Sequence, residues 1–233
     1  MKEKFQLKQT VVTIIADAPE HIASAKQAIR VNRRSLENFI ESNPFFRFAL
    51  EPIEDYVGNP PDIVRRMLDA SSAAKVGPMA AVAGVIADLA VEAMVDAGAP
   101  YAIVDNGGDI ALTSDRDVIV GIYGGVSPFK DVGFKIEPNR FLGVCTSSAT
   151  VGPSISFGPA DVACVIAKTA CLADAAASAL GNLSDDPKAA FGAIKDISGV
   201  IGALLIVGDK FATWGRLPTL VRASVDAACV THA

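Results

Sequence analysis

The chain has 233 residues, 51% of them hydrophobic, and is long enough to bury the core of one large domain or of two joined halves. Lysine and arginine total 21 against 26 acidic residues, and this net charge of −5, with scattered basic residues, argues against nucleic acid as a partner. The most apolar segment, residues 79–97, contains acidic side chains, which argues against a membrane span. The first residues lack the apolar stretch of a secretory signal, so we expect a cytoplasmic protein.

The cysteine pattern indicates buried thiols rather than a metal site. No two cysteines stand in Cys-x-x-Cys spacing, and only His21 and His232 could complete a zinc site. Free cysteine is among the most buried residue types, so we expect these side chains in the core. The four cysteines are Cys145, Cys164, Cys171 and Cys229.

The first predicted elements are a strand over residues 9–16 and a long amphipathic helix. Asp17 and Glu20, on either side of Pro19, resemble a helix start whose side chains accept hydrogen bonds from free backbone N–H groups. The helix should end before Pro44, because proline cannot continue it. Its apolar face consists of residues at helical spacing, namely Ile22, Ala25, Ile29, Leu36 and Ile40.

An extended segment and two helices are expected next. Residues 45–50 read as extended, and residues 60–68 predict a short helix that starts at a pair of prolines. An alanine-rich helix should begin at Pro78, where the missing N–H of proline costs nothing. It should end at Gly98, which can adopt the left-handed conformation of a helix cap.

The alanine-rich helix carries an acidic stripe. Asp88, Glu92 and Asp96 lie four residues apart and therefore on one face. A solvated helix face is the simplest interpretation of this stripe. Asp88 gains a second interpretation from the resemblance described below.

Short strands separated by turn residues dominate the remaining chain. A helix is expected over residues 169–180, another begins at Asp186, and a final hairpin of residues 200–207 and 210–214 turns at Gly208-Asp209. The other strands are expected over residues 101–104, 118–123, 132–136, 141–145 and 161–167.

These elements predict an α+β fold with mainly antiparallel sheet and helices packed on it, because the strands outnumber the crossovers that parallel pairing needs. Residues 1–217 should form a single domain, and residues 218–233 a peripheral C-terminal segment.

The turn at residues 104–110 is the strongest candidate for a site. Gly107 and Gly108 let backbone N–H groups approach a ligand closely, with Asn106 and Asp109 beside them. Asn-Gly and Gly-Asp are also ordinary turn dipeptides, so a turn without function is the alternative.

Two further segments bring oxygen-bearing side chains to the ends of predicted elements. Thr146 and Ser147 belong to a hydroxyl-rich stretch suited to donating to phosphate, although it could be a simple polar turn. Asp174 and Ser178 share one helix face and could bind a hard cation, although they could also hydrogen-bond within a packed interface. Together the three segments suit a phosphate ester held through magnesium.

The order of these motifs resembles the ApbE-like superfamily, whose best-known members are FAD:protein FMN transferases. Those proteins carry a Lys-Gly-x-x-x-Asp helix before a Gly-Gly-Asp turn, and residues 83–88 and 104–110 are similar. The family's Thr-Ser-Gly loop and Ala-Asp-Ala-x-x-Thr helix correspond to residues 146–148 and 173–178. Further segments resemble the uncharacterised UPF0280 branch, namely residues 9–10, 77–84 and 154–158.

The resemblance implies an ApbE-like, T-fold-related fold of two related halves with a ligand between them. It implies Mg²⁺ at Asp174 and Ser178, phosphate at Thr146 and Ser147, and a polar contact at Asp88. It also implies FAD or FMN as the ligand and another protein as the acceptor. The nucleotide-side pocket would consist of Asn106, Gly107, Gly108 and Asp109.

The sequence departs from the transferase motifs at several positions. Ala83 replaces the lysine, Ser148 the glycine and Ser178 the threonine, and no His-x-x-Asp-Pro-x-Thr-Gly segment occurs between Val151 and Asp161. The missing lysine and histidine remove a cation and a base, which weakens the prediction of flavin transfer. Ser178 keeps the hydroxyl oxygen that a metal would need.

Three hypotheses follow for function. The first is an enzyme or former enzyme that binds a phosphorylated ligand, such as a flavin nucleotide, with Mg²⁺ and transfers FMN from FAD. The second is an enzyme of sulfur or cofactor assimilation that uses Cys145 as a thiolate. The third is a non-catalytic binding protein that has kept the fold. An alanine-rich surface on residues 162–180 would suit subunit packing, so a homo-oligomer is also expected.

Overall fold

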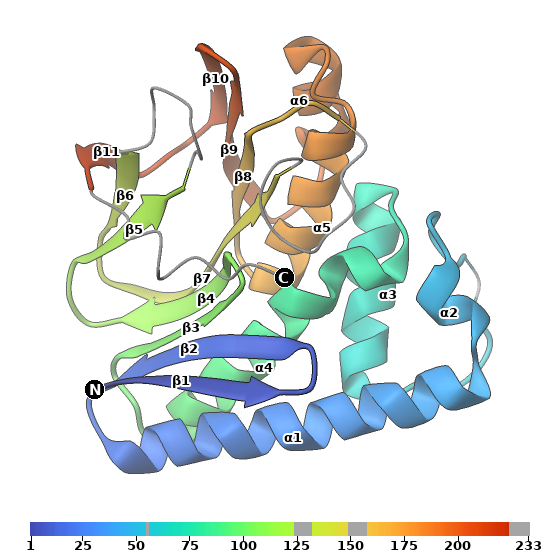
Figure 1. Cartoon of the computed structure of the whole chain (residues 1–233), viewed down its shortest axis with the longest axis vertical. Coiled ribbons are helices and arrows are strands. Elements are labelled where there is room, and N and C mark those ends of the chain that lie inside the picture. Colours follow the sequence, from blue (N-terminus) through green and yellow to red (C-terminus); the bar gives the residue numbers. More distant parts are fainter. Residues whose placement is uncertain (55, 124–131, 149–157, 224–233) are drawn as a thin grey trace.

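An eight-stranded antiparallel sheet runs through the molecule in the order β1-β2-β3-β4-β7-β8-β9-β10 (Figure 1). The computed structural model describes residues 1–54, 56–123, 132–148 and 158–223. The strands of this sheet are β1 Lys2–Leu7, β2 Thr10–Ala16, β3 Ala102–Asn106, β4 Asp109–Ser114, β7 Asn139–Ser147, β8 Val162–Ala167, β9 Val200–Val207 and β10 Lys210–Gly215. A smaller antiparallel sheet has the order β11-β6-β5, with β5 Val118–Ile122, β6 Val132–Ile136 and β11 Thr219–Arg222.

Helices cover one face of the large sheet, and the small sheet lies on the other side (Figure 1). The helices are α1 Pro19–Ser42, α2 Phe45–Phe48, α3 Asp62–Ala74, the 3₁₀-helix η1 Pro78–Ala81, α4 Val82–Asp96, α5 Ala170–Asn182 and α6 Pro187–Ile194. This arrangement confirms the predicted α+β fold with mainly antiparallel sheet.

Strand β8 shows why the sheet needs a layer on each face. All six of its residues are buried, so it reads as a continuous apolar run rather than an alternating one. Ala163 and Val165 belong to the core beneath the helices, whereas Cys164 and Ile166 belong to the core beneath the small sheet. Successive side chains point to opposite faces, and both faces are covered.

The large sheet contains two halves with the same topology. In the first half the order is β1, β2, helices, β3, β4, and in the second it is β7, β8, helices, β9, β10. In each half a helix begins three residues after the second strand ends, at Pro19 and at Ala170. The halves meet where α4 packs on α5, and a Cβ at Gly84 would lie only 2.2 Å from the Ala170 carbonyl oxygen. Glycine is therefore required at this crossing.

Several predictions in the first half were wrong. Strand β1 was missed because its alternating charged residues carry little apolar signal, and β4 because Asp109 was read as part of a turn. Residues 45–50 are not extended, since Phe45–Phe48 form a single helical turn after Asn43 and Pro44. Asp17 does not cap α1, because its carboxylate accepts hydrogen bonds from Arg116 instead.

The predicted end of the alanine-rich helix is confirmed. Gly98 has φ of +90°, its N–H donates to the Val95 carbonyl, and the Ala99 N–H donates to the Met94 carbonyl. These two bonds form a Schellman motif, which satisfies carbonyl groups at the helix end. Pro78–Asp96 has the length and hydropathy of a membrane span, but 56% of that window is buried within the fold, as in a core helix.

The acidic stripe also needs correction, and the C-terminal segment contributes a strand to the small sheet. Asp88 is buried rather than solvated, Glu92 forms a bidentate pair with Arg66 of α3, and only Asp96 is exposed. Within the C-terminal segment, Thr219–Arg222 pairs with β6 as an edge strand of the small sheet. Residues 224–233, including Cys229 and His232, lie outside the described residues.

Candidate functional site

A two-residue turn at Gly107 and Gly108 joins β3 to β4. Their φ angles are +72° and +101°, and positive φ at both central positions is the pattern of a type I′ hairpin turn. The Gly108 N–H donates to Asp105 Oδ1 at 2.8 Å, which braces the turn. Apart from their own chain neighbours, no atom of the described residues lies within 4 Å of the Cβ position of either glycine. The backbone of the turn is therefore open on that side.

Asn106 ties this turn to the start of helix α4. Its side chain is buried, and its Nδ2 donates to the Ala83 carbonyl oxygen at 3.0 Å. Asn106 lies directly opposite Asp109 across the hairpin, and Asp109 lies opposite Cys145 of β7. The residues predicted for the nucleotide-side pocket are thus brought together with the N-terminal turn of α4.

Helices α4 and α5 cap each other. Asp174 of α5 accepts the Gly84 N–H of α4 at 2.9 Å, and the Ala83 amide also bonds to this carboxylate. Asp88 of α4 accepts the N–H groups of Ala170 and Cys171 at 2.8 Å each. Each carboxylate therefore satisfies amides at a helix N-terminus, where negative charge is favourable.

This cap changes the interpretation of Asp88. Each of its oxygens already accepts a hydrogen bond from a backbone amide of α5, so Asp88 contacts the protein itself at the position where a polar contact to a ligand was predicted. Burial raises the pKa of Asp88 to about 6, against the lowering effect of those two hydrogen bonds. Asp88 therefore joins the halves of the fold and has no oxygen left that is not hydrogen-bonded.

Asp109 and Asp174 form the chemically distinctive part of the site. Burial raises the pKa of Asp109 well above its usual value, and the charge of Asp174 raises it further. Burial also raises the pKa of Asp174 to about 7, although the amides of Gly84 and Ala83 lower it. Neither carboxylate has a salt-bridge partner among the residues that the structure describes. Two carboxylates thus lie close together without a compensating cation.

The two predicted phosphate ligands of β7 point in different directions. Thr146 is paired with Cys164, its side chain hydrogen-bonds that thiol, and Cys164 belongs to the core beneath the small sheet. Ser147 is paired with Ala163 of the helix-side core. Because side chains alternate along a strand, only Ser147 shares a face with Asp109. The rest of the hydroxyl-rich stretch, from residue 149 to 152, lies outside the described residues.

The side chains near Asp174 are of the kind that Mg²⁺ binds. Ser178 lies one helical turn after Asp174, and its partly buried hydroxyl makes no hydrogen bond within the described parts of the chain. Carboxylate and hydroxyl oxygens suit a hard cation. No group of three or more His, Cys, Asp or Glu in the described residues could hold a metal ion. Water and phosphate oxygens would therefore have to complete the coordination, as is usual for Mg²⁺.

Comparison with known proteins identifies the family to which this chain belongs. A family model described as AbpE bacteria matches residues 2–204. A UPF0280 protein of Methanosarcina acetivorans is 53% identical over 238 residues, covering 100% of this chain and 94% of that protein. A UPF0280 protein of Methanocella arvoryzae is 56% identical over 227 residues, covering 96% of this chain and 92% of that protein. The chain belongs to the UPF0280 family.

Solved structures similar to this UPF0280 protein are ApbE proteins. The flavinyl transferase ApbE of Pseudomonas stutzeri has a TM-score of 0.56 at 14% identity, covering 92% of this chain and 94% of that chain. The ApbE protein of Thermotoga maritima has a TM-score of 0.54 at 12% identity, covering 96% of each chain. These likenesses confirm the ApbE-like fold that the motifs predicted.

Cys145 of the UPF0280 protein has the wrong environment for a nucleophile. Its side chain is buried, and its Sγ donates to the Ala170 carbonyl oxygen at 3.3 Å. Burial raises the pKa of this thiol well above its usual value, and the charges of Asp109 and Asp174 raise it further. A reactive thiolate needs a lowered pKa and access to solvent, so these features oppose the Cys145 hypothesis.

Sequence patterns did not indicate two features of the site. The amides of Ala83 and Gly84 are held by Asp174, which is 90 residues away from Gly84 in the chain. The Cys145 thiol lies beside Asp109 and lowers its pKa, against the effect of burial. The residue types alone carried no signal for either contact, because both depend on how the halves pack.

Proposed function

We propose that this UPF0280 protein binds a phosphorylated ligand, a flavin nucleotide such as FAD or FMN, together with Mg²⁺ at Asp174 and Ser178. The observation that carries the proposal is the pair Asp109 and Asp174, two neighbouring carboxylates with raised pKa and no salt-bridge partner in the described residues. A bound divalent cation would supply the positive charge that both carboxylates and a phosphate need.

The protein's own residues explain why the phosphate would need this cation. Helix N-termini often bind phosphate directly, but here Asp88 and Asp174 already cap α5 and α4. Ala83 stands where the transferases carry lysine, so no side-chain cation replaces it there. A phosphate entering the site alone would meet carboxylates of its own sign.

Three groups on the helix side of the sheet would then contact the ligand. The open backbone of Gly107 and Gly108 allows a planar or phosphorylated group to approach closely. The Ser147 side chain, which shares this face, can donate a hydrogen bond to a phosphate oxygen. The third is Asp109, whose carboxylate accepts a hydrogen bond from the Thr146 amide that would hold it in place.

The transferase form of the proposal adds one reaction. A hydroxyl of an acceptor protein would attack the FMN phosphorus of FAD, so that a phosphoester forms and AMP leaves. Asp109 would accept the hydroxyl proton, because Asp174 is engaged with the cation and a carboxylate with a raised pKa is a better base. This form is supported by the fold shared with the flavinyl transferase ApbE. Ala83 favours the second candidate, a protein that binds flavin without turnover.

The test is a flavin titration with two matched variants. Asp174→Asn and Asp88→Asn each weaken one helix cap, but only the first removes a proposed metal ligand. We expect absorbance and fluorescence titrations with FAD and Mg²⁺ to show binding that Asp174→Asn weakens by about 10- to 100-fold. Asp88→Asn should bind flavin like the natural protein. Equal loss in both variants, or no binding at roughly 100 µM FAD, would contradict the proposal.

A second measurement separates the two forms of the proposal. Incubation of the natural protein with FAD and Mg²⁺ should release AMP if the phosphoryl-transfer chemistry is retained, with water or an added hydroxyl peptide as acceptor. Binding of flavin with no AMP release over many hours would identify the non-catalytic form. AMP release that persists in Asp174→Asn would contradict the role given to Asp174.

A further inference from the structure

The ends of corresponding strands in the two halves carry different charges. In the first half, Asp17 follows β2 and Arg116 lies two residues after β4. Arg116 donates to Asp17 at 2.6 Å, and its guanidinium lies 4.6 Å from the centre of the Tyr101 ring. This corner of the fold is closed by an ion pair and a cation–π contact.

The second half has two cations at the corresponding corner. Lys168 follows β8, as Asp17 follows β2, and Arg216 follows β10. Both side chains are exposed, and neither has a salt-bridge partner in the described residues. Lys168 thus occupies in the second half the position that Asp17, the ion-pair partner of Arg116, occupies in the first half. The two cations at this corner therefore carry positive charge that no acidic side chain in the described part of the chain balances by an ion pair.

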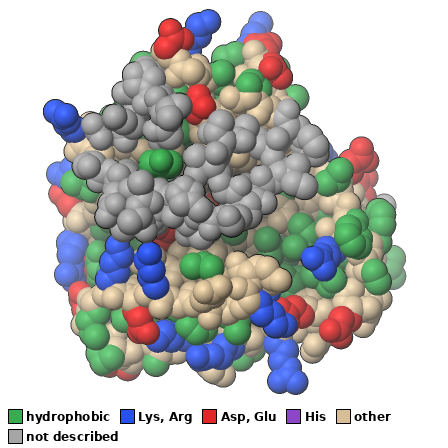
Figure 2. All heavy atoms as spheres, in the orientation of Figure 1, with side chains coloured by type: hydrophobic (Ala, Val, Ile, Leu, Met, Phe, Trp, Pro, Cys, Tyr) green, Lys and Arg blue, Asp and Glu red, His purple; other side chains and the backbone are tan. Residues whose placement is uncertain are grey.

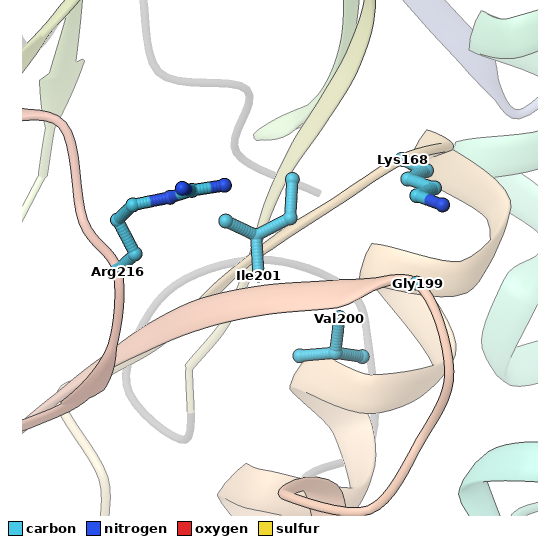
Figure 3. A pocket seen from close by; sticks show the side chains of 5 residues that line it. All are labelled: Lys168, Gly199, Val200, Ile201 and Arg216. Carbon is cyan, nitrogen blue, oxygen red and sulfur yellow. The ribbon is translucent and has the colours of Figure 1, made fainter.

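Lys168 and Arg216 line a concavity of about 360 Å³ (Figure 3). Arg216 lies on one side of Ile201 and Lys168 on the other, near the start of α5. The remaining lining residues are Gly199 and Val200, so no carboxylate of the described residues contributes to the lining. A cavity of this size lies at the lower end of the range for small-molecule sites.

The backbone holds both cations in place. The Lys168 N–H donates to the Gly199 carbonyl, and the Arg216 N–H donates to the Ile201 carbonyl, both at 2.9 Å. A Cβ at Gly202 would lie 2.7 Å from the Arg216 carbonyl oxygen, so the chains approach closely there. The main chain that carries both side chains is therefore fixed, which sets the positions from which they reach into the concavity.

This corner is separate from the carboxylate site. Asp109 is paired with Cys145 and Cys145 with Val165, and Lys168 lies three residues further along the chain, about 10 Å at the rise of a strand. Basic and acidic side chains both occur across the face shown in Figure 2. The chain as a whole has a net charge of −5, so the two cations of this concavity differ in sign from the protein around them.

We infer that the concavity between Lys168 and Arg216 binds the phosphate group of a small molecule, without a metal ion. The planar guanidinium of Arg216 can hold two phosphate oxygens, and Lys168 adds a second positive charge. Two cations match the charge of a phosphate near neutral pH. The inference goes beyond the proposed flavin site and does not depend on it.

The experiment is a calorimetric titration in EDTA, so that metal-dependent binding at the other site cannot contribute. The probes are inorganic phosphate and phosphoserine, which distinguish free phosphate from an organic phosphomonoester by which of them binds more tightly. The variants are Arg216→Ala and Lys168→Asp, and the control is Lys188→Ala, an exposed lysine of α6. Lys168→Asp reproduces the charge pair of the first half, so it should fold while losing the site.

We expect saturable binding of at least one probe with a Kd in or below the millimolar range. Arg216→Ala and Lys168→Asp should weaken it by at least about tenfold, and Lys188→Ala should leave it unchanged. Added NaCl should weaken it as well, because exposed charges are screened. No saturation by roughly 10 mM of either probe, or equal binding by the natural protein and both variants, would overturn the inference. Thermal melting of Lys168→Asp near that of the natural protein excludes unfolding as the cause.

Discussion

The two hairpin turns at corresponding places in the halves have the same length but different surroundings. Gly107-Gly108 is tied to α4 through Asn106 and lies near Asp174. Gly208-Asp209 joins β10, an edge strand, and its Gly208 N–H donates to Asp161 at 2.7 Å. The same strand order thus places one turn against the start of α4 near the centre of the sheet and the other at the edge of the sheet.

Gly84→Ala tests whether contact between the halves maintains this difference. The added Cβ would lie 2.2 Å from the Ala170 carbonyl oxygen, so α4 and α5 must separate. We expect the free energy of unfolding to fall by about 3 kcal/mol, measured by chemical denaturation. The control is Gly192→Ala in α6, where no atom lies within 4 Å and alanine should be neutral or stabilising. Equal effects of the two substitutions would be inconsistent with a close crossing at Gly84.

The second prediction compares the helix caps by their pH dependence. The folded protein holds a proton on Asp88 up to about pH 6, whereas the unfolded chain releases it near 3.8. The free energy of unfolding should therefore fall as pH rises from about 4 to 6, by up to about 1.4 kcal/mol per pH unit. Asp88→Asn should reduce this slope between pH 4 and 6, and Asp174→Asn should reduce it up to pH 7.

Denaturation at several pH values measures both slopes. The third variant, Asp17→Asn, is the control, because Asp17 lies at an exposed corner and caps no helix. A pH slope that is unchanged in Asp88→Asn and Asp174→Asn would show that neither carboxylate is protonated in the folded state in this range.

The third prediction sharpens the comparison of the two turns. Gly108 has φ of +101° and Gly208 has φ of +60°, and neither Cβ position has an atom within 4 Å. Substitution by alanine should cost about 1 kcal/mol of stability in each case, through backbone strain alone. Only Gly108→Ala should also weaken flavin binding in the titration described above. Weaker binding in both variants would mean that the loss of binding follows stability rather than the site.

The smallest expected effect concerns the strand-end corners. Lys168→Asp places a carboxylate beside Arg216, as Asp17 lies beside Arg116 in the first half. The new pair is exposed, so the gain in stability should be at most about 0.5 kcal/mol, measured by thermal melting at low salt. A loss of more than about 1 kcal/mol would show that Lys168 has a structural role.

The parts of the fold with a strong local signal were predictable from the sequence. The helix end at Gly98 and the hairpin at Gly208-Asp209 follow from the backbone preferences of glycine and were confirmed. Strand β8 was recognisable from its apolar run. Strand β1 was not, because it is an edge strand with alternating charges whose position depends on pairing with β2.

The site was predictable in its residue types but not in its contacts. Asn106, Asp109 and Asp174 do come together, as their motifs suggested. The hydrogen bonds of Asp88 could not be predicted from the sequence, because its partners Ala170 and Cys171 lie 82 and 83 residues away in the chain. Thr146 and Ser147 were predicted to bind phosphate together because the strand was expected to end at Cys145. The strand β7 continues to Ser147, and neighbouring side chains of a strand point to opposite faces of the sheet.

Removal of the metal tests the central proposal most directly. FAD should be titrated into the natural protein by calorimetry, once with millimolar Mg²⁺ and once with EDTA. Because Asp109 and Asp174 place negative charge at the turn, binding should be at least about tenfold tighter with Mg²⁺. Equal affinity for FAD in Mg²⁺ and in EDTA, or no binding in either, would contradict the account.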